Sequence, residues 1–231
     1  MLKDLRKEIG KLSNRKRAEA SKWFFKTGKG EYGEGDVFNG LSVPDCRKIA
    51  KNFSNIDLGN IEKLLRSKIH EERLIALLIL VDKFKKGDEK IRKEIYNFYL
   101  KNTYGINNWD LVDLSSHKII GSYLLNKDRK ILYKLAKSKN LWERRIAVVS
   151  CFAFIAEKDF KDSIKIAELL LKDKHDLVHK AVGWMLREVG KREELVLKRF
   201  LDKHYKEMPR TMLRYSLERL NKEDKKRYMG R

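Results

Sequence analysis

Apolar residues recur along this chain with the spacing of an α-helix, and strand-like alternation is hard to find anywhere. The first such set consists of Leu74, Leu77, Leu78 and Val81. Their i, i+3, i+4, i+7 spacing places them on one face of a helix. The same pattern returns within residues 146–152 and 182–189. Two prolines and thirteen glycines are also too few turn-forming residues for a sandwich or barrel of many short strands. We therefore predict an all-α protein.

Internal repetition indicates how the helices are arranged. The segment 67–76 is echoed by the segment 138–147, an offset of 71 residues. Steps of about half this offset, namely 35, 36 and 35 residues, lead from Leu74 to Trp109, Arg145 and Lys180. The period suits stacked pairs of antiparallel helices and is slightly shorter than a HEAT or armadillo repeat. We predict an α-solenoid of HEAT-like helix pairs with a concave cleft, forming one domain over residues 1–231.

A glycine-rich stretch interrupts the helical pattern near the start of the chain. It covers residues 27–36 and holds four glycines within eight residues. It separates a predicted basic helix, which ends near Phe25, from a helix that begins at Pro44-Asp45, a favourable first turn. The stretch lacks the GK[ST] of a phosphate-binding P-loop, and no strand precedes it. We interpret it as an ordered connection that lies close to a phosphate.

The chain carries a large excess of positive charge. Its 231 residues include 54 Lys and Arg against 33 Asp and Glu, a formal net charge of +21. Such an excess predicts a polyanionic partner, nucleic acid first and an anionic membrane surface second. The alternative is the lysine-rich surface of a heat-adapted protein. That surface would normally carry a matching excess of glutamate for ion-pair networks, which this chain lacks.

Several other classes are disfavoured by the sequence. Cys46 and Cys151 stand alone, so neither a disulfide framework nor a zinc cluster is indicated. We interpret the histidines as surface residues rather than metal ligands; they are His70, His117, His175, His179 and His204. The absence of a signal peptide and of an apolar run of about 20 residues predicts a soluble cytoplasmic protein. We expect no cofactor and no metal.

Four residues at related positions of the repeat form a candidate site. Trp109 and Asp113 are one helical turn apart, behind Asn107 and Asn108, either of which could cap the helix. Arg145, one step of 36 residues further along, occupies the repeat position that corresponds to Trp109. Trp184 follows Lys180 by four residues, as Asp113 follows Trp109. Two indoles, a carboxylate and a guanidinium are thus expected on one surface.

Each of these residues also has a structural interpretation. A tryptophan at helical spacing is more often part of the core, and Trp23 and Trp142 are expected there. Asp110 and Asp113 could be acids on a helix surface, and Arg145 a solvated charge. Gly183, beside Trp184, is expected to leave the backbone open to the close approach of a large ligand. The shared position in the repeat and the net charge favour the functional interpretation.

Five blocks of the sequence resemble the AlkD-like DNA alkylation repair proteins, which are HEAT-like-repeat DNA glycosylases. They are GEGDVFNGLSVPDCRKIAK (33–51), NNWDLVDLSS (107–116), LWERRIAVVS (141–150), KAVGWMLREVGKR (180–192) and MPRTMLRYSLERL (208–220). The resemblance covers nearly the whole chain, and the second and fourth blocks are the most specific. It assigns functional roles to Trp109, Asp113, Arg145 and Trp184.

The resemblance implies an alkylpurine DNA glycosylase of base excision repair, acting on duplex DNA as a monomer. Its substrates would be positively charged purines such as 7-methylguanine and 3-methyladenine, including bulky adducts, without a base-flipping pocket. Asp113 would be catalytic, and Trp109, Arg145 and Trp184 would bind the DNA. This chain departs from the family pattern at Asp176-Leu177 and at Asn108, where relatives carry aromatic residues. These departures bear on the choice of lesion.

Two other functions are compatible with the sequence. One is a catalytically silent helical-repeat module that binds distorted DNA. The other is a scaffold that binds RNA or an acidic protein. A Ser-His-Asp hydrolase built from Asp113, Ser115 or Ser116 and His117 is disfavoured, because residues so close on one helix diverge around it and no nucleophile elbow is present.

Overall fold

The computed structural model describes residues 1–230 and confirms the all-α prediction. Its only strand-like feature within these residues is a single bridge between Val37 and Ile69. The chain divides into two compact units, Met1–Ser115 and Ser116–Arg231. We describe each unit by itself, and the single domain stays a prediction. No helix within residues 1–230 is both long and apolar enough to cross a membrane.

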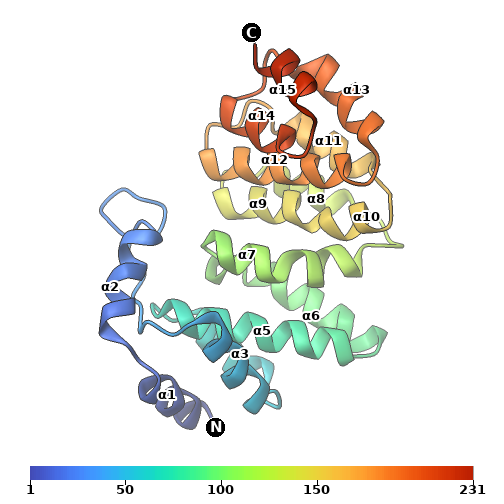
Figure 1. Ribbon diagram of the computed structural model, residues 1–231. Coiled ribbons are helices and arrows are strands. Elements are labelled where there is room, and N and C mark those ends of the chain that lie inside the picture. Colours follow the sequence, from blue (N-terminus) through green and yellow to red (C-terminus); the bar gives the residue numbers. More distant parts are fainter. Residues whose placement is uncertain (231) are drawn as a thin grey trace. The chain divides into compact units, whose positions relative to one another are not determined.

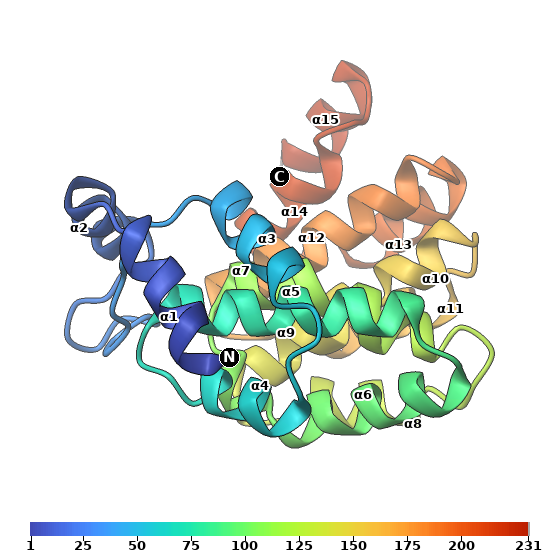
Figure 2. The same ribbon diagram turned by 90° about the horizontal axis from the view of Figure 1, so that it is seen from below.

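The first unit is built around one central helix. Its elements are α1 (Leu2–Lys11), α2 (Arg15–Phe24), α3 (Val43–Asn52), α4 (Leu58–Leu65), α5 (His70–Lys86), α6 (Glu89–Lys101), a 3₁₀ turn (Thr103–Gly105) and α7 (Trp109–Ser116), which ends at the boundary of the units. Helices α3, α4 and α6 all pack against α5 (Figures 1 and 2). As a result, α5 is buried on every side over residues 70–80 rather than along a single stripe.

The burial of α5 includes charged residues that the apolar spacing did not predict. Glu72 is 2% exposed and is held by Arg6 of α1, whose Nε and Nη2 donate to its two oxygens at 2.9 and 3.0 Å. Glu71 is 3% exposed and accepts hydrogen bonds from the backbone amides of residues 39–41. Buried carboxylates are stable only when paired in this way. Both therefore fasten the N-terminal segments to α5.

The N-terminal region differs from the prediction in one respect. The expected single basic helix is two helices, because Asn14 caps a new one by accepting a hydrogen bond from the amide of Arg17. The predicted end near Phe25 is confirmed, since α2 ends at Phe24. The predicted start at Pro44 is confirmed as well, because Pro44 lies in the first turn of α3 behind a Ser42–Asp45 capping box.

The second unit is a series of helices that pack on the next helix in sequence or on one slightly further along the chain. It comprises a π-helix (His117–Gly121), α8 (Lys130–Ala136), α9 (Leu141–Ser150), α10 (Phe152–Ala156), α11 (Lys161–Leu169), α12 (Asp176–Gly190), α13 (Glu194–His204), α14 (Arg210–Leu217) and α15 (Lys222–Met229). Helix α12 packs against both α9 and α14, and Figure 1 shows these three helices lying one above another. Short connections between contacting helices, such as that from α8 to α9, are typical of helix pairs.

Gly183 serves this packing and not the approach of a ligand, which corrects the sequence interpretation. A Cβ atom at Gly183 would lie 2.5 Å from the carbonyl oxygen of Met212 and 2.6 Å from the Cβ of Tyr215, both on α14. The missing side chain therefore lets the backbones of α12 and α14 approach closely.

Substituting Gly183 with alanine is expected to lower the free energy of unfolding by about 1–3 kcal/mol, because the new methyl group would overlap backbone atoms of α14. The matched control is Gly10→Ala in α1, where nothing lies within 4 Å of the new Cβ. Alanine there should be neutral or stabilising by up to about 1 kcal/mol. Urea denaturation of the two variants measures both effects. Equal stability of Gly183→Ala and the unmodified protein would contradict the assignment.

Candidate nucleic-acid interface

Helix α7 begins with the tryptophan that the sequence singles out. Asn108, which is fully buried, accepts a hydrogen bond from the amide of Trp109 at 2.8 Å, and its carbonyl accepts one from Val112. Asn108 therefore caps α7. The sequence alone leaves open whether Asn107 or Asn108 does so. Its side-chain amide also donates to Asp36 at 3.4 Å. At this position, where the sequence departs from the family pattern, the amide side chain of Asn108 thus bonds both the start of α7 and Asp36.

Trp109 is half-buried against the end of α2. Its ring stacks on Phe25, with centroids 5.4 Å apart and planes 23° apart. It also makes an edge contact with Phe24 at 5.8 Å. These contacts fix the indole from one side. Part of it remains open to solvent.

Asp113, one turn further along α7, is also half-buried. Burial and the charge of the nearby Asp113 carboxylate both raise the pKa of Tyr99, although a hydrogen bond with Ser115 acts in the opposite direction. The Oγ of Ser115 lies 2.9 Å from the Tyr99 hydroxyl and donates to the carbonyl of Leu111. Ser115 is fully buried and engaged, so it is no nucleophile for a hydrolase. Trp109 and Asp113 thus lie one turn apart on α7, as predicted.

A buried charge network lies beneath the start of α7, and the sequence did not predict it. His70, only 2% exposed, contacts two carboxylates: its Nδ1 lies 3.2 Å from Asp36 and its Nε2 lies 2.8 Å from Asp110. Arg73 pairs with Asp36 at 2.7 Å. Nη2 of Arg73 also lies 3.4 Å from Nδ1 of His70. A carboxylate oxygen at each ring nitrogen favours the imidazolium form of His70, in which both nitrogens donate.

The titration of these groups follows from their contacts. Burial tends to lower the pKa of His70, but the charge of Asp110 and hydrogen bonds with both carboxylates raise it to about 9. Burial tends to raise the pKa of Asp36, but the hydrogen bond with His70 and the charge of Arg73 hold it below its usual value. His70 and Asp36 are therefore both charged at neutral pH.

The network joins three segments that are distant in sequence. Asp36 ends the glycine-rich stretch, His70 and Arg73 belong to the first turn of α5, and Asp110 belongs to the first turn of α7. The ring of His70 also lies against Phe25 and Phe38, with centroids 4.9 and 4.8 Å away. The same Phe25 carries Trp109. His70 is therefore a positioning residue for the start of α7 and for its tryptophan.

In the second unit, Arg145 is almost completely buried. It is 5% exposed and lies on α9, with Nη1 donating to the carbonyl of Leu177 in the first turn of α12. The neighbouring Arg144 binds Asp173 with both Nε and Nη2, at 2.6 and 3.4 Å. Arg145 is thus not the solvated charge of the alternative interpretation. The two arginines tie α9 to the beginning of α12.

Trp184, on α12 of the same unit, is half-buried beside two other rings. Its centroid lies 6.2 Å from that of Phe152, which in turn makes an edge contact with His117 at 5.4 Å. The guanidinium of Arg192 lies over Phe152, 5.6 Å from the ring centre. The sequence placed Phe152 only in an apolar pattern. Its proximity to Trp184 marks it as part of this aromatic surface.

The predicted repeat positions are one turn out of register at Trp109. Counted from the helix start, the fifth residues of α5, α9 and α12 are Leu74, Arg145 and Lys180. Trp109 is instead the first residue of α7, and the fifth is Asp113. The difference arises because the cap at Asn108 sets where α7 begins. By this count Asp113, not Trp109, corresponds to Arg145, and the expectation that all four residues share one surface stays a prediction.

Other predictions also meet a mixed outcome. Trp142 is 7% exposed and belongs to the core as expected, whereas Trp23 is 74% exposed and does not. His70 and His204 are buried and in contact with acidic side chains, so the surface interpretation is wrong for both. Within residues 1–230, no three His, Cys, Asp or Glu side chains are grouped so that they could hold a metal ion.

The glycine-rich stretch satisfies its own amides. The amide of Gly28 donates to Glu31 and that of Gly30 to Glu34, both at 2.8 Å. These carboxylates occupy the positions that an anion would take in a phosphate-binding loop. The stretch connects α2 to α3, and its last residue, Asp36, is held by His70 and Arg73 of α5.

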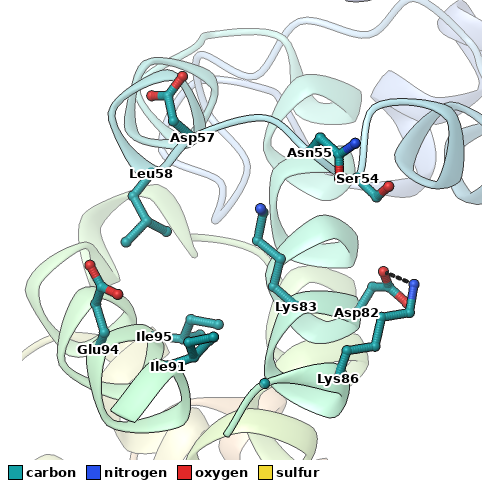
Figure 3. A pocket seen from close by; sticks show the side chains of 11 residues that line it. Ser54, Asn55, Asp57, Leu58, Asp82, Lys83, Lys86, Ile91, Glu94 and Ile95 are labelled. Atoms are coloured by element: carbon teal, nitrogen blue, oxygen red, sulfur yellow. Dashed lines mark hydrogen bonds and ion pairs between the residues drawn. The ribbon is translucent and has the colours of Figure 1, made fainter.

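Two pockets of the first unit are lined by residues other than the predicted site residues. One, of about 410 Å³, lies between the start of α4, the end of α5 and the start of α6. Figure 3 shows the ammonium of Lys83 reaching into it above Ile91 and Ile95, beside the Asp82–Lys86 ion pair. The second, of about 340 Å³, is lined by residues that include Asp36, Arg73 and Asn107. It therefore borders the charge network.

Comparisons with known proteins identify the class of this fold. The structure resembles that of a predicted DNA alkylation repair enzyme from Enterococcus faecalis, with a TM-score of 0.72 and 17% sequence identity over 91% of this chain and 97% of the other. A family model described as DNA alkylation repair enzyme matches residues 5–220. No curated protein matches the chain. The chain belongs to the DNA alkylation repair enzyme family, which supports a role in alkylation repair and confirms the resemblance drawn from the sequence.

Proposed function

We propose that this protein is a DNA glycosylase that releases positively charged alkylated purines, such as 7-methylguanine and 3-methyladenine, from duplex DNA. Family membership and the net charge of +21 support DNA as the partner. The observation that carries the proposal is the pairing of Asp113 with Trp109 on α7. Both are half-buried and one turn apart. A carboxylate beside an indole suits a reaction that develops positive charge.

The chemistry of the substrate explains why one carboxylate could suffice. A cationic base is already a good leaving group, so no general acid has to protonate it. The remaining barrier is the formation of an oxocarbenium-like sugar cation, as in glycoside hydrolysis. Asp113 would stabilise this cation electrostatically and orient or deprotonate the attacking water.

The remaining residues are assigned to DNA binding. Trp109 and Trp184 would offer ring faces to the cationic nucleotide, for about 0.5–2 kcal/mol each. Arg145 would bind a backbone phosphate, for which the planar guanidinium is better suited than an ammonium. Because Arg145 also donates to Leu177, its substitution should disturb α12 as well as DNA binding. In this proposal the backbone is held and no pocket takes up the base, so bulky adducts are accepted.

The proposal predicts a characteristic set of released bases. Incubation of methylated duplex DNA with the protein should release 7-methylguanine and 3-methyladenine, as measured by chromatography against a sample without protein. Hypoxanthine and uracil should not be released at comparable rates, because an unprotonated neutral base is a poorer leaving group than a cationic purine. Comparable release of neutral bases would refute the mechanism. No release of any base, with retained binding to distorted DNA, would favour the silent module instead.

A further inference from the structure

Two aromatic side chains at the end of α2 are exposed to solvent. Trp23 is 74% exposed and Phe24 is 54% exposed. Large adjacent aromatic residues on a surface mark an interaction site more often than chance. Neither residue belongs to the site predicted from the sequence, which placed Trp23 in the core.

The pair is continuous with the proposed DNA-binding tryptophan. The ring of Phe24 contacts both Phe25, at 5.1 Å, and Trp109, at 5.8 Å. Phe25 stacks on Trp109 in turn. The aromatic contacts therefore extend from Trp109 to Phe24, the sequence neighbour of Trp23 at the end of α2. All of these residues belong to the first unit.

The end of α2 is held in place by the glycine-rich stretch. The amide of Gly33 donates to the carbonyl of Lys26 at 3.0 Å, and Lys26 adopts a positive φ of 54°, where the chain reverses. A side chain at Gly33 would overlap the carbonyl of Phe25. The backbone that follows the aromatic pair is thus packed against the stretch. The backbone at the end of α2, which carries Trp23 and Phe24, is consequently held in place by the fold.

The charges around the pair favour nucleic acid as the partner. The ammonium of Lys26 lies 5.0 Å from the ring centre of Trp23. Arg15, Lys16 and Lys22 are exposed on α2, whose one acid, Glu19, is paired with Lys22. Cations around aromatic faces suit a polyanion that carries flat bases. A membrane-surface helix would need a longer apolar face than the two aromatic residues at one end of α2.

We propose that Trp23 and Phe24 bind distorted duplex DNA, with Trp23 stacking on a base or base step that has lost its normal stacking. The inference rests on the proposed function in taking DNA as the partner, and it adds a contact outside α7. Phe24 would connect this contact to the nucleotide at Trp109. Aromatic side chains are used in this way to hold unstacked bases or to enter loosened base steps.

The test compares Trp23→Ala with the unmodified protein on two duplexes, one intact and one containing a tetrahydrofuran abasic analogue. Affinity for the abasic duplex should fall roughly 5- to 100-fold, as expected when one base-stacking contact is lost. Affinity for the intact duplex should change much less, and the salt dependence of binding should be unchanged, because no phosphate contact is removed. The control is Tyr104→Ala, which removes a 43% exposed aromatic residue elsewhere in the same unit.

Tryptophan fluorescence supplies an independent readout. Quenching by the abasic duplex should be smaller in Trp23→Phe than in the unmodified protein, while circular dichroism is unchanged. Equal affinities of Trp23→Ala and the unmodified protein, an equal loss on both duplexes, or quenching of Trp23 by anionic vesicles and not by DNA would overturn the inference. A parallel assay of base release tests the proposed function separately. If the protein releases no base but its DNA affinity depends on Trp23, only the proposed function is refuted. If the protein releases alkylated bases but its DNA affinity does not depend on Trp23, only the role of Trp23 is refuted.

Discussion

Asp113→Asn is expected to slow the release of 7-methylguanine from methylated DNA by about 10²- to 10³-fold under single-turnover conditions. The substitution keeps the size of the side chain and removes its charge, so the sugar cation would lose its electrostatic partner. Asparagine can still form hydrogen bonds at this half-buried position beside Tyr99. Affinity for DNA should therefore be unchanged or slightly higher, since a negative charge near the phosphates is removed.

A matched control separates this effect from a general change of charge. Asp82→Asn removes one carboxylate from α5, where it pairs only with the exposed Lys86. Such a surface pair contributes little to stability, so base release should match that of the unmodified protein. Equal activity of Asp113→Asn and the unmodified protein would remove Asp113 from the mechanism. Activity in neither would support a module that binds DNA without cutting the glycosidic bond.

The local patterns that the sequence could predict are those that depend on neighbouring residues. The start of α3 followed from Ser42, Pro44 and Asp45, whose capping interactions are complete within one turn. The end of α2 and the all-α class followed in the same way from turn residues and helical spacing. Trp109 and Asp113 share a turn of α7 because their spacing requires it.

The predictions that failed depend on contacts between distant segments. Gly183 looks like an open backbone until α14, about 30 residues later in the chain, is seen to fill the space. The surface interpretation of His70 failed because Asp36 and Asp110, 34 and 40 residues away, surround it. The core expectation for Trp23, a tryptophan at helical spacing, failed because its side chain is left 74% exposed in the first unit. Spacing along the chain carries no information on such partners.

His70 is the residue whose replacement should most reduce stability. In His70→Leu the carboxylates of Asp36 and Asp110 stay buried while their shared cation is removed, which should lower the free energy of unfolding by about 3–5 kcal/mol at neutral pH. His70→Gln can donate to only one of the two carboxylates and should be intermediate. The control is His204→Gln, because the partners of His204 are the more exposed Glu168 and Glu207. Its loss should stay below about 1 kcal/mol.

The contribution of His70 should depend on pH in a defined direction. Its pKa in the folded protein is raised to about 9, above the ordinary value of 6.5 that applies to the unfolded chain. The imidazolium therefore stabilises the fold fully below about pH 6.5, and this stabilisation is lost as pH rises through about 9. The difference in unfolding free energy between the unmodified protein and His70→Leu should shrink by about 3 kcal/mol over that interval. Urea denaturation from pH 6 to 9.5 measures the difference, and NMR of the His70 ring gives the midpoint directly. A difference that is constant with pH, or a ring that titrates near 6.5, would show that His70 is not the cation of this network.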